Sequence, residues 1–322
     1  MAKIALAIHG GAGTILKSEM TAELEKEYRG GLENALRTGW DILSKNGSSL
    51  DAVEAAVVEL ENFPLFNAGR GSVFTHEGKN ELDASIMDGK NLRAGAVAFV
   101  KNVKNPVKLA RLVMEKTEHI MLGGEGANEF ARQMNVEFAP DEYFFTEHRY
   151  LQLMKAIKAN RIQLDHADEM ENDTENPKSK IQNPKSLGTV GAVACDSNGN
   201  LAAATSTGGM TNKKFGRIGD TPIIGAGTYA ENATCAVSCT GHGEFFMLGA
   251  TAFDVSARMK YKNLSLEEAA QETINYQTEI GGEGGLIAVD KLGNIALPFN
   301  SDGMYRGFIQ ADGMITISIY RN

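Results

Sequence analysis

The spacing of apolar residues along the chain predicts several amphipathic helices. Residues 20–45 combine helical spacing with mixed charge, and a second helix is expected to begin after Ser49. Ser265 and Glu268, three residues apart, have the capping-box pattern that starts another helix. The other helices are expected at Pro106–Met114 and at residues 142–160, 244–260 and 266–280.

Shorter apolar runs predict strands between these helices. In the first half of the chain they lie at Lys3–Ile8, at residues 82–88 and 94–100, and at His119–Leu122. The second half carries two hairpins with the same Asp-x-x-Gly-Asn turn. Their strands are Val190–Asp196 with Leu201–Thr207, and Leu286–Asp290 with Ile295–Phe299. This order of strands and helices predicts an α/β fold with two sheets between helical layers, in a single domain spanning residues 1–322.

One segment departs from this pattern. The segment from about residue 162 to residue 187 begins with a strongly acidic stretch and continues with a stretch rich in proline and lysine. Such a composition cannot bury enough apolar surface to offset the entropy cost of ordering the chain. Two interpretations stay open: an ordinary surface loop, or a disordered linker that becomes a tail when the chain is cut before Thr189. The second is favoured.

Composition excludes several classes of partner. The net charge is −9 and no basic stripe is present, so nucleic acid is not expected to bind. No apolar run approaches the length of a membrane span. Three cysteines in a long chain argue against a disulfide framework and for a reducing compartment. We therefore expect a soluble cytoplasmic protein.

The most informative residue for chemistry is Thr189, which stands between Gly188 and an alternating apolar run. A hydroxyl nucleophile needs a base, and no Ser/His/Asp pattern supplies one. If the bond before Thr189 were cut, the new α-amino group, with a pKa of roughly 7.7–8.0, could accept the proton. Gly188 can adopt strained conformations, as such a cut would require. The alternative is a threonine that merely opens a strand after a turn glycine.

Two other groups of residues invite a functional interpretation. Thr207 ends the return strand of the first hairpin, so it is expected beside Thr189, although hydroxyl-rich strands are often only cross-strand pairs. Arg217 and Asp220 could hold the carboxylate and ammonium of an amino acid, or they could form an exposed ion pair of little energetic value.

Other motifs carry less weight. Cys235, Cys239 and His242 could suggest zinc, but they offer only three ligands and the cysteines fit a buried strand. The glycine-rich stretches at residues 10–13 and 281–285 lack the Gly-Lys-Ser/Thr of a phosphate loop, and no G-x-S-x-G motif occurs.

Six separated motifs, taken in order, resemble the plant-type L-asparaginase/isoaspartyl peptidase family of N-terminal nucleophile hydrolases. The motifs are His9-Gly10-Gly11-Ala12-Gly13, Phe66-Asn67-Ala68-Gly69, Gly188-Thr189-Val190-Gly191, Thr205-Ser206-Thr207-Gly208-Gly209, Gly216-Arg217-Ile218-Gly219-Asp220 and Cys239-Thr240-Gly241-His242-Gly243-Glu244. The resemblance extends from residue 3 to about residue 307. It implies a four-layer αββα sandwich that is made as a precursor and cut between Gly188 and Thr189.

The resemblance also implies roles for individual residues. Thr189 would be the nucleophile, with Thr207 as its hydrogen-bond partner, and His9 would be structural. The Thr240 hydroxyl and the Gly241 amide would form the oxyanion hole. The substrate would be bound by Arg217, Asp220, the Gly243 carbonyl and Asn67.

A sodium ion is implied by resemblance only. It would be wrapped by the main-chain carbonyls of Leu60, Glu61, Phe63, Phe66, Ala68 and Arg70. Main-chain oxygens suit a hard cation but leave no side-chain pattern to recognise. Arg70 stands where an apolar residue can occur, and carbonyl ligation should survive that difference. No cofactor is expected for the chemistry itself.

The predicted activity is hydrolysis of β-aspartyl (isoaspartyl) dipeptides and L-asparagine, with release of L-aspartate. The preference between these substrates stays open. A homodimer of cleaved protomers is expected from the resemblance. One alternative is a glycosylasparaginase, which usually has disulfides and an aspartate before the nucleophile, where this chain has Gly188. Another is a non-enzymatic scaffold that keeps the fold and is never cut.

Overall fold

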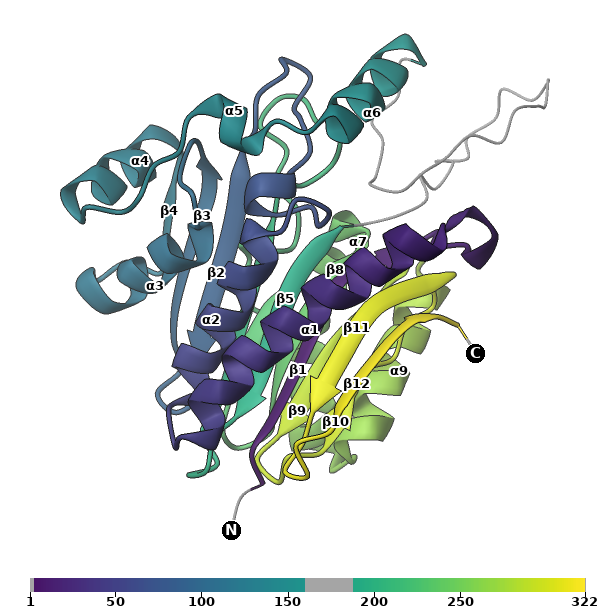
Figure 1. Cartoon of the computed structure of the whole chain (residues 1–322). Helices are drawn as coiled ribbons and strands as arrows, with labels where there is room; N and C mark the ends of the chain where they lie inside the picture. Colours follow the sequence, from purple (N-terminus) through teal and green to yellow (C-terminus); the bar gives the residue numbers. More distant parts are fainter. Residues whose placement is uncertain (1–2, 160–187, 322) are drawn as a thin grey trace.

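The computed structural model describes residues 3–159 and 188–321, and its larger sheet has eight strands (Figure 1). Their spatial order is β12-β11-β1-β5-β6-β2-β3-β4, and of these neighbours only β3 and β4 run parallel. The strands are β1 (Ala5–Gly13), β2 (Leu82–Asp88), β3 (Arg93–Val100), β4 (Met121–Gly123), β5 (Thr189–Cys195), β6 (Leu201–Thr207), β11 (Gly303–Ile309) and β12 (Ile315–Tyr320).

The smaller sheet has four antiparallel strands in the order β10-β9-β8-β7. They are β7 (Thr228–Ala230), β8 (Cys235–Gly241), β9 (Gly284–Asp290) and β10 (Ile295–Ala296). Strands β8 and β9 contact β5, β6 and β1, so the two sheets pack on one another. The apolar side chains between them are mostly small, including Ala5, Ala7, Ala203 and Ala236.

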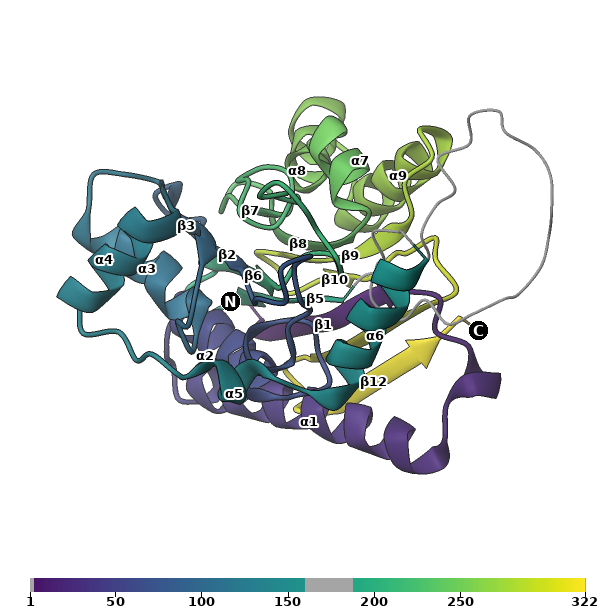
Figure 2. The same cartoon turned by 90° about the horizontal axis from the view of Figure 1, so that it is seen from above.

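The long helices lie on the outer sides of the sheets (Figure 2). Helices α1, α2 and α3 contact the larger sheet, and α8 and α9 contact the smaller one. Further short helices join these elements. The α-helices are α1 (Ala22–Ser44), α2 (Ser49–Asn62), α3 (Pro106–Lys116), α4 (Gly124–Gln133), α5 (Asp141–Phe144), α6 (Glu147–Lys158), α7 (Gly243–Leu248), α8 (Thr251–Lys262) and α9 (Leu266–Glu279).

Two predicted helices are each broken into two. The helix expected at residues 142–160 becomes α5 and α6, because Phe145 is extended and the Thr146 hydroxyl accepts the Arg149 N–H as the N-cap of α6. The helix expected at 244–260 becomes α7 and α8, because Ala250 has a left-handed conformation with φ 44°. The capping box of Ser265 and Glu268 is confirmed at the start of α9.

Strand boundaries also differ from the prediction. β1 does not end at Ile8 but continues through the glycine loop to Gly13, with a bulge between His9 and Gly11. The final strand of the second hairpin is shorter than expected, since β10 ends at Ala296. The sequence also gave no indication of α4, β7, β11 or β12. The first hairpin and strands β2 and β3 form as predicted.

The linker expected at about 162–187 lies outside the described residues, so its conformation stays a prediction. In the part of the chain that is described, none of the helices combines the length and apolar character needed to cross a membrane.

Two adjacent glycines of α1 give a matched test of this packing. A Cβ on Gly30 would meet nothing within 4 Å, whereas one on Gly31 would lie 2.8 Å from the Phe63 ring. Gly30→Ala should therefore raise the free energy of unfolding by about 0.5–1 kcal/mol, because alanine favours a helix. Gly31→Ala should lower it by about 1–3 kcal/mol through overpacking. Urea unfolding of both variants checks this, and equal effects would contradict the packing of α1 on Phe63.

Candidate active site

The antiparallel pairing of β5 with β6 places Thr189 directly opposite Thr207. Thr189 is the first residue of β5 and is 7% exposed. Its hydroxyl donates to the Thr207 hydroxyl over 3.1 Å, and Thr207 Oγ1 also accepts the Gly209 N–H at 3.0 Å. Thr189 and Thr207, the two threonines that the sequence indicated as functional candidates, are thus in direct contact.

The pairing of β1 with β5 puts His9 opposite Gly191, where it contacts the nucleophile candidate. His9 Nδ1 lies 2.9 Å from the Thr189 carbonyl oxygen, and Nε2 lies 2.9 Å from Ser238 Oγ on the smaller sheet. A carbonyl only accepts, so Nδ1 carries the proton. Burial lowers the pKa of His9 to about 3, although its bond to Thr189 opposes the shift, so the ring is neutral. His9 therefore holds the backbone of Thr189 and cannot serve it as a charged group.

Thr240 and Gly241 end strand β8, on the sheet that faces β5. Thr240 is fully buried, and its hydroxyl oxygen has no hydrogen-bond partner among the described residues. Such a group costs about 1–3 kcal/mol to bury. A hydroxyl kept without a partner is suited to receive a ligand atom that the protein alone does not supply.

Arg217, Asp220 and Gly243, the residues to which the resemblance gives substrate binding, lie close together. A Cβ on Gly243 would lie 2.8 Å from Arg217 Nη2 and 3.0 Å from Asp220 Oδ1, so a side chain there would displace the Arg217 guanidinium. Asp220 is buried, and its Oδ2 has no partner within the described ranges. Burial raises the pKa of Asp220 to about 7, against the opposing effect of the Arg217 charge.

Arg217 has a partner that the sequence analysis missed. Its Nε and Nη2 both bond the Glu244 carboxylate, at 2.9 Å each. Burial opposes ionisation of Glu244, but the bonds from Arg217 keep the pKa of this carboxyl below its usual value. Glu244 was expected only to open the helix after Gly243, and its place in the first turn of α7 was the available signal.

A second missed feature is a buried aspartate, Asp83, beside Thr207, with a buried lysine, Lys213, close enough to influence its pKa. Asp83 of β2 lies opposite Thr207, so Thr189, Thr207 and Asp83 form a row across three strands. Asp83 accepts the Phe99 N–H at 2.9 Å, while Lys213 donates to the Glu81 carbonyl at 2.9 Å. Burial raises the pKa of Asp83 and lowers that of Lys213, and the two opposite charges partly offset both shifts. An aspartate inside an apolar strand was the overlooked signal.

Asn67 faces the same region. Its side chain donates to the Gly209 carbonyl at 2.8 Å and accepts the Val73 N–H at 2.9 Å. The Gly208 N–H bonds the Asn67 carbonyl at 3.1 Å. Asn67 thus fixes the turn that follows Thr207.

The loop between α2 and residue 71 turns several carbonyls inward. A Cβ on Gly69 would lie 2.5 Å from the Glu61 oxygen, and one on Gly71 would lie 2.2 Å from the Phe66 oxygen. The carbonyls of Leu60, Phe66 and Ala68 each accept one N–H within this loop, which leaves each a second lone pair. Such a concentration of main-chain oxygens fits a hard cation.

Side chains can also hold a metal ion, through clusters of His, Cys, Asp and Glu. Over residues 3–159 and 188–321, no group of three or more His, Cys, Asp and Glu side chains could hold a metal ion. Cys235 and Cys239 are buried in β8 and face the core beneath α8 and α9. This agrees with the interpretation of both cysteines as residues of a buried strand.

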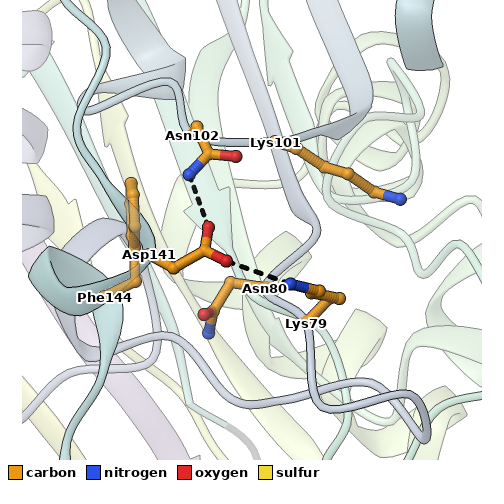
Figure 3. Close-up of a pocket in the computed structure, with 6 residues that line it drawn as sticks. All are labelled: Lys79, Asn80, Lys101, Asn102, Asp141 and Phe144. Carbon is orange, nitrogen blue, oxygen red and sulfur yellow. Dashed lines mark hydrogen bonds and ion pairs between the residues drawn. The ribbon is translucent and has the colours of Figure 1, made fainter.

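A surface hollow lies elsewhere, beside α5 (Figure 3). In it Asp141 accepts hydrogen bonds from Asn102 at 2.7 Å and from Lys79 at 3.0 Å. Lys101 lines the same hollow and forms its own ion pair with Glu81. None of the residues proposed for chemistry lines it.

Comparison with known proteins agrees with the resemblance found in the sequence. A family model described as Asparaginase matches residues 2–319. The isoaspartyl peptidase of Escherichia coli (strain K12) is 49% identical over 322 residues, covering 100% of this chain and 97% of the relative. An isoaspartyl peptidase/L-asparaginase of Xenopus laevis is 44% identical over 319 residues, covering 99% and 96%. One of Mus musculus is 44% identical over 302 residues, covering 94% and 86%. The chain therefore belongs to the asparaginase and isoaspartyl peptidase family.

Proposed function

We propose that the protein is a self-processing hydrolase that cleaves β-aspartyl dipeptides and L-asparagine and releases L-aspartate. The observation that carries the proposal is the contact of Thr189 with Thr207 at the first residue of a buried strand, directly after Gly188. Relatives named isoaspartyl peptidase or L-asparaginase support the choice of substrates. Gly188 in place of an aspartate, and three free buried cysteines, count against a glycosylasparaginase.

Processing begins with the same hydroxyl that later attacks substrate. Thr189 Oγ1 adds to the Gly188 carbonyl carbon, the C–N bond breaks, and the nitrogen leaves as the α-amine of Thr189. Water then hydrolyses the Gly188 ester. The products are residues 1–188 and residues 189–322, and the second begins with a threonine that carries its own base.

Turnover repeats this chemistry on the substrate. The amine of Thr189 takes the proton from Oγ1, which attacks the side-chain carbonyl of the β-aspartyl group. The Thr240 hydroxyl and the Gly241 N–H stabilise the oxyanion, and removing one such donor typically costs about 2.7–4 kcal/mol of barrier. The proton passes to the leaving amine, a β-aspartyl ester remains on Thr189, and water releases aspartate.

The substrate head is held by opposite charges. Arg217 pairs with the α-carboxylate, while Asp220 and the Gly243 carbonyl accept from the α-ammonium. Asn67 supports the turn beside Thr207. Glu244 occupies two of the five N–H donors of Arg217, so the incoming carboxylate would bind the remaining three.

A sodium ion fits the carbonyl-rich loop. Its ligands would be the main-chain oxygens of Leu60, Glu61, Phe63, Phe66, Ala68 and Arg70. The ion would stabilise the loop that carries Asn67 and would take no part in bond breaking.

Three broader properties belong to the same proposal. The two packed sheets with helices outside them form the four-layer αββα sandwich of N-terminal nucleophile hydrolases. The working form is a homodimer of cleaved protomers. It resides in the cytoplasm, which the free cysteines Cys195, Cys235 and Cys239 support.

Thr189→Ala should abolish both cleavage and turnover, because one residue supplies the nucleophile and the future base. A denaturing gel compares cleavage in the variant and in the wild type. N-terminal sequencing of the smaller wild-type fragment should give Thr-Val-Gly-Ala-Val. An uncut wild-type chain that still hydrolyses β-Asp-Leu would rule out the mechanism. An uncut and inactive wild type would favour a scaffold protein.

Arg217→Ala should lower kcat/KM for β-Asp-Leu at least tenfold in cleaved protein. The lost charged hydrogen bonds contribute about 1.5–3 kcal/mol each, and about 1.4 kcal/mol corresponds to tenfold. The control is Arg258→Ala, which removes an ion pair with Asp254 in α8 and should leave turnover unchanged. Normal kcat/KM in cleaved Arg217→Ala, or equal wild-type cleavage of α-Asp-Leu, would refute the clamp.

The raised pKa of Asp220 predicts the pH dependence of kcat/KM. Asp220 must be ionised to hold the ammonium, so binding should weaken as the pH falls through about 7. The amine of Thr189 must also be deprotonated, so log kcat/KM should rise with a limiting slope of two on the acid side. Asp220→Asn, tested after cleavage, should be less active with a slope of one. A wild-type slope of one would show that Asp220 does not titrate with activity.

A further inference from the structure

A second polar row lies directly beneath the row of Thr189, Thr207 and Asp83. Two residues further along the strands, the larger sheet aligns His9, Gly191, Thr205 and Ser85 across β1, β5, β6 and β2. The smaller sheet aligns Thr228 with Ser238 across β7 and β8. The side chains of the five polar residues are fully buried.

These side chains form one continuous chain of hydrogen bonds between the sheets. Ser238 Oγ lies 2.9 Å from His9 Nε2 and 2.7 Å from Thr205 Oγ1. Thr205 contacts Thr228, and Thr228 lies 2.7 Å from Ser85 Oγ. Gly191 makes room for the chain, since a Cβ there would lie 2.0 Å from Ser238 Oγ.

The two ends of the chain lie on the two parts of the proposed site. At one end His9 bonds the carbonyl of Thr189, the nucleophile candidate. At the other end Ser85 bonds the carbonyl of Thr221 at 2.6 Å, next to Asp220. The core between the sheets is otherwise lined by small apolar residues, so this chain is a polar connection through it.

The direction of each bond follows from the two carbonyl ends. His9 Nδ1–H donates to Thr189, so the neutral ring accepts at Nε2 and Ser238 must donate to it. Ser85 lies within hydrogen-bond distance of both the Thr221 carbonyl and Thr228, and its one proton goes to the carbonyl, which can only accept. Ser238 has used its proton on His9, so it can only accept from Thr205.

Thr205 has one proton, while Ser238, Thr228 and the Gly227 carbonyl all lie within hydrogen-bond distance of its hydroxyl. Six contacts join the Thr189 carbonyl to the Thr221 carbonyl, while the neutral ring and four hydroxyls supply five protons. Thr205, which has more partners than protons, divides the chain into two arms. The first arm is Ser238 and His9, and the second is Thr228 and Ser85.

We infer that Ser238, through His9, positions the nucleophile, and that Ser85 positions the substrate anchor through the Thr221 carbonyl. This inference rests on the proposed function. Removing Ser238 leaves His9 Nε2 without its donor, and removing Ser85 leaves the Thr221 carbonyl without its donor. Removing the Thr205 hydroxyl leaves every other member still able to donate to its partner, so the central residue matters least.

The arms are separated by measuring self-cleavage rate, kcat on β-Asp-Leu and the inhibition constant of L-aspartate, which has the substrate head but no bond to cut. Ser238→Ala should slow self-cleavage and lower kcat at least threefold, with L-aspartate inhibition within twofold of wild type. Ser85→Ala should raise the inhibition constant at least threefold, with self-cleavage and kcat within twofold. Thr205→Val should leave the self-cleavage rate, kcat and the inhibition constant of L-aspartate within twofold of wild type.

The matched control is Ser256→Ala, a buried hydroxyl of α8 that pairs with Thr234 outside the chain of hydrogen bonds. The self-cleavage rate, kcat and L-aspartate inhibition constant of this control should match those of the wild type. If Ser238→Ala fails to fold, Ser238→Cys keeps a weak donor of similar size and should give an intermediate loss of kcat and cleavage rate. Thermal unfolding identifies which variants are folded.

The inference is overturned if Ser238→Ala and Ser85→Ala change the three quantities in the same pattern, or if both stay at wild-type values. It is also overturned if Thr205→Val is the most damaging change. An active wild type without this division refutes the inference alone. A wild type and a Ser256→Ala control that do not hydrolyse β-Asp-Leu would instead refute the proposed function, and the inference with it.

Discussion

The antiparallel register of β5 with β6 is the constraint on which the site depends. It puts Thr189 opposite Thr207 and, two residues on, Gly191 opposite Thr205. A shift of one residue would turn Thr189 to the other face of the sheet, toward α2, and away from β8. The tight turn between Asp196 and Asn200 fixes this register, since the Asp196 carboxylate accepts N–H groups from Asn198 and Asn200. A surface turn thus determines where Thr189 lies.

The site contains polar atoms that the protein leaves without partners. Thr240 Oγ1, Asp220 Oδ2 and Asp83 Oδ2 are buried and have none in the described part of the chain. Each such atom costs about 1–3 kcal/mol of stability. Substrate groups would supply the missing partners of Thr240 and Asp220. Folding therefore already places these two groups for binding, at a cost in stability that the substrate would offset. By contrast, Arg217 is already paired with Glu244, so a substrate carboxylate would have to use the remaining N–H donors of Arg217.

Local patterns in the sequence predicted most of the regular elements. The first hairpin was predictable because its turn and alternating strands are contiguous, and this alone brings Thr207 to Thr189. The broken helices were missed because each break depends on one residue, the N-cap Thr146 or the left-handed Ala250. The continuation of β1 was missed because glycines favour loops, whereas here they pass through a bulge between neighbouring strands.

The missed site residues depend on contacts between distant parts of the chain. Asp83 reaches Thr207 only because β2 pairs with β6, and no local pattern announces that pairing. Glu244 contacts Arg217 although the two are 27 positions apart in the sequence, with β7 and β8 between them. Ser85 and Ser238 read as ordinary strand residues until the two sheets are packed together. The resemblance supplied the candidate roles of Arg217, Asp220 and Thr240, but it did not reveal these supporting contacts.

Thr189 is proposed to form the covalent bond to substrate. This can be measured by peptide mapping with mass spectrometry after rapid acid quench of the enzyme turning over β-Asp-Leu. We expect a β-aspartyl ester on the peptide that begins with Thr189, with a free α-amine on the same residue. An ester on another residue, or active enzyme in which Thr189 still follows Gly188 through a peptide bond, would contradict it.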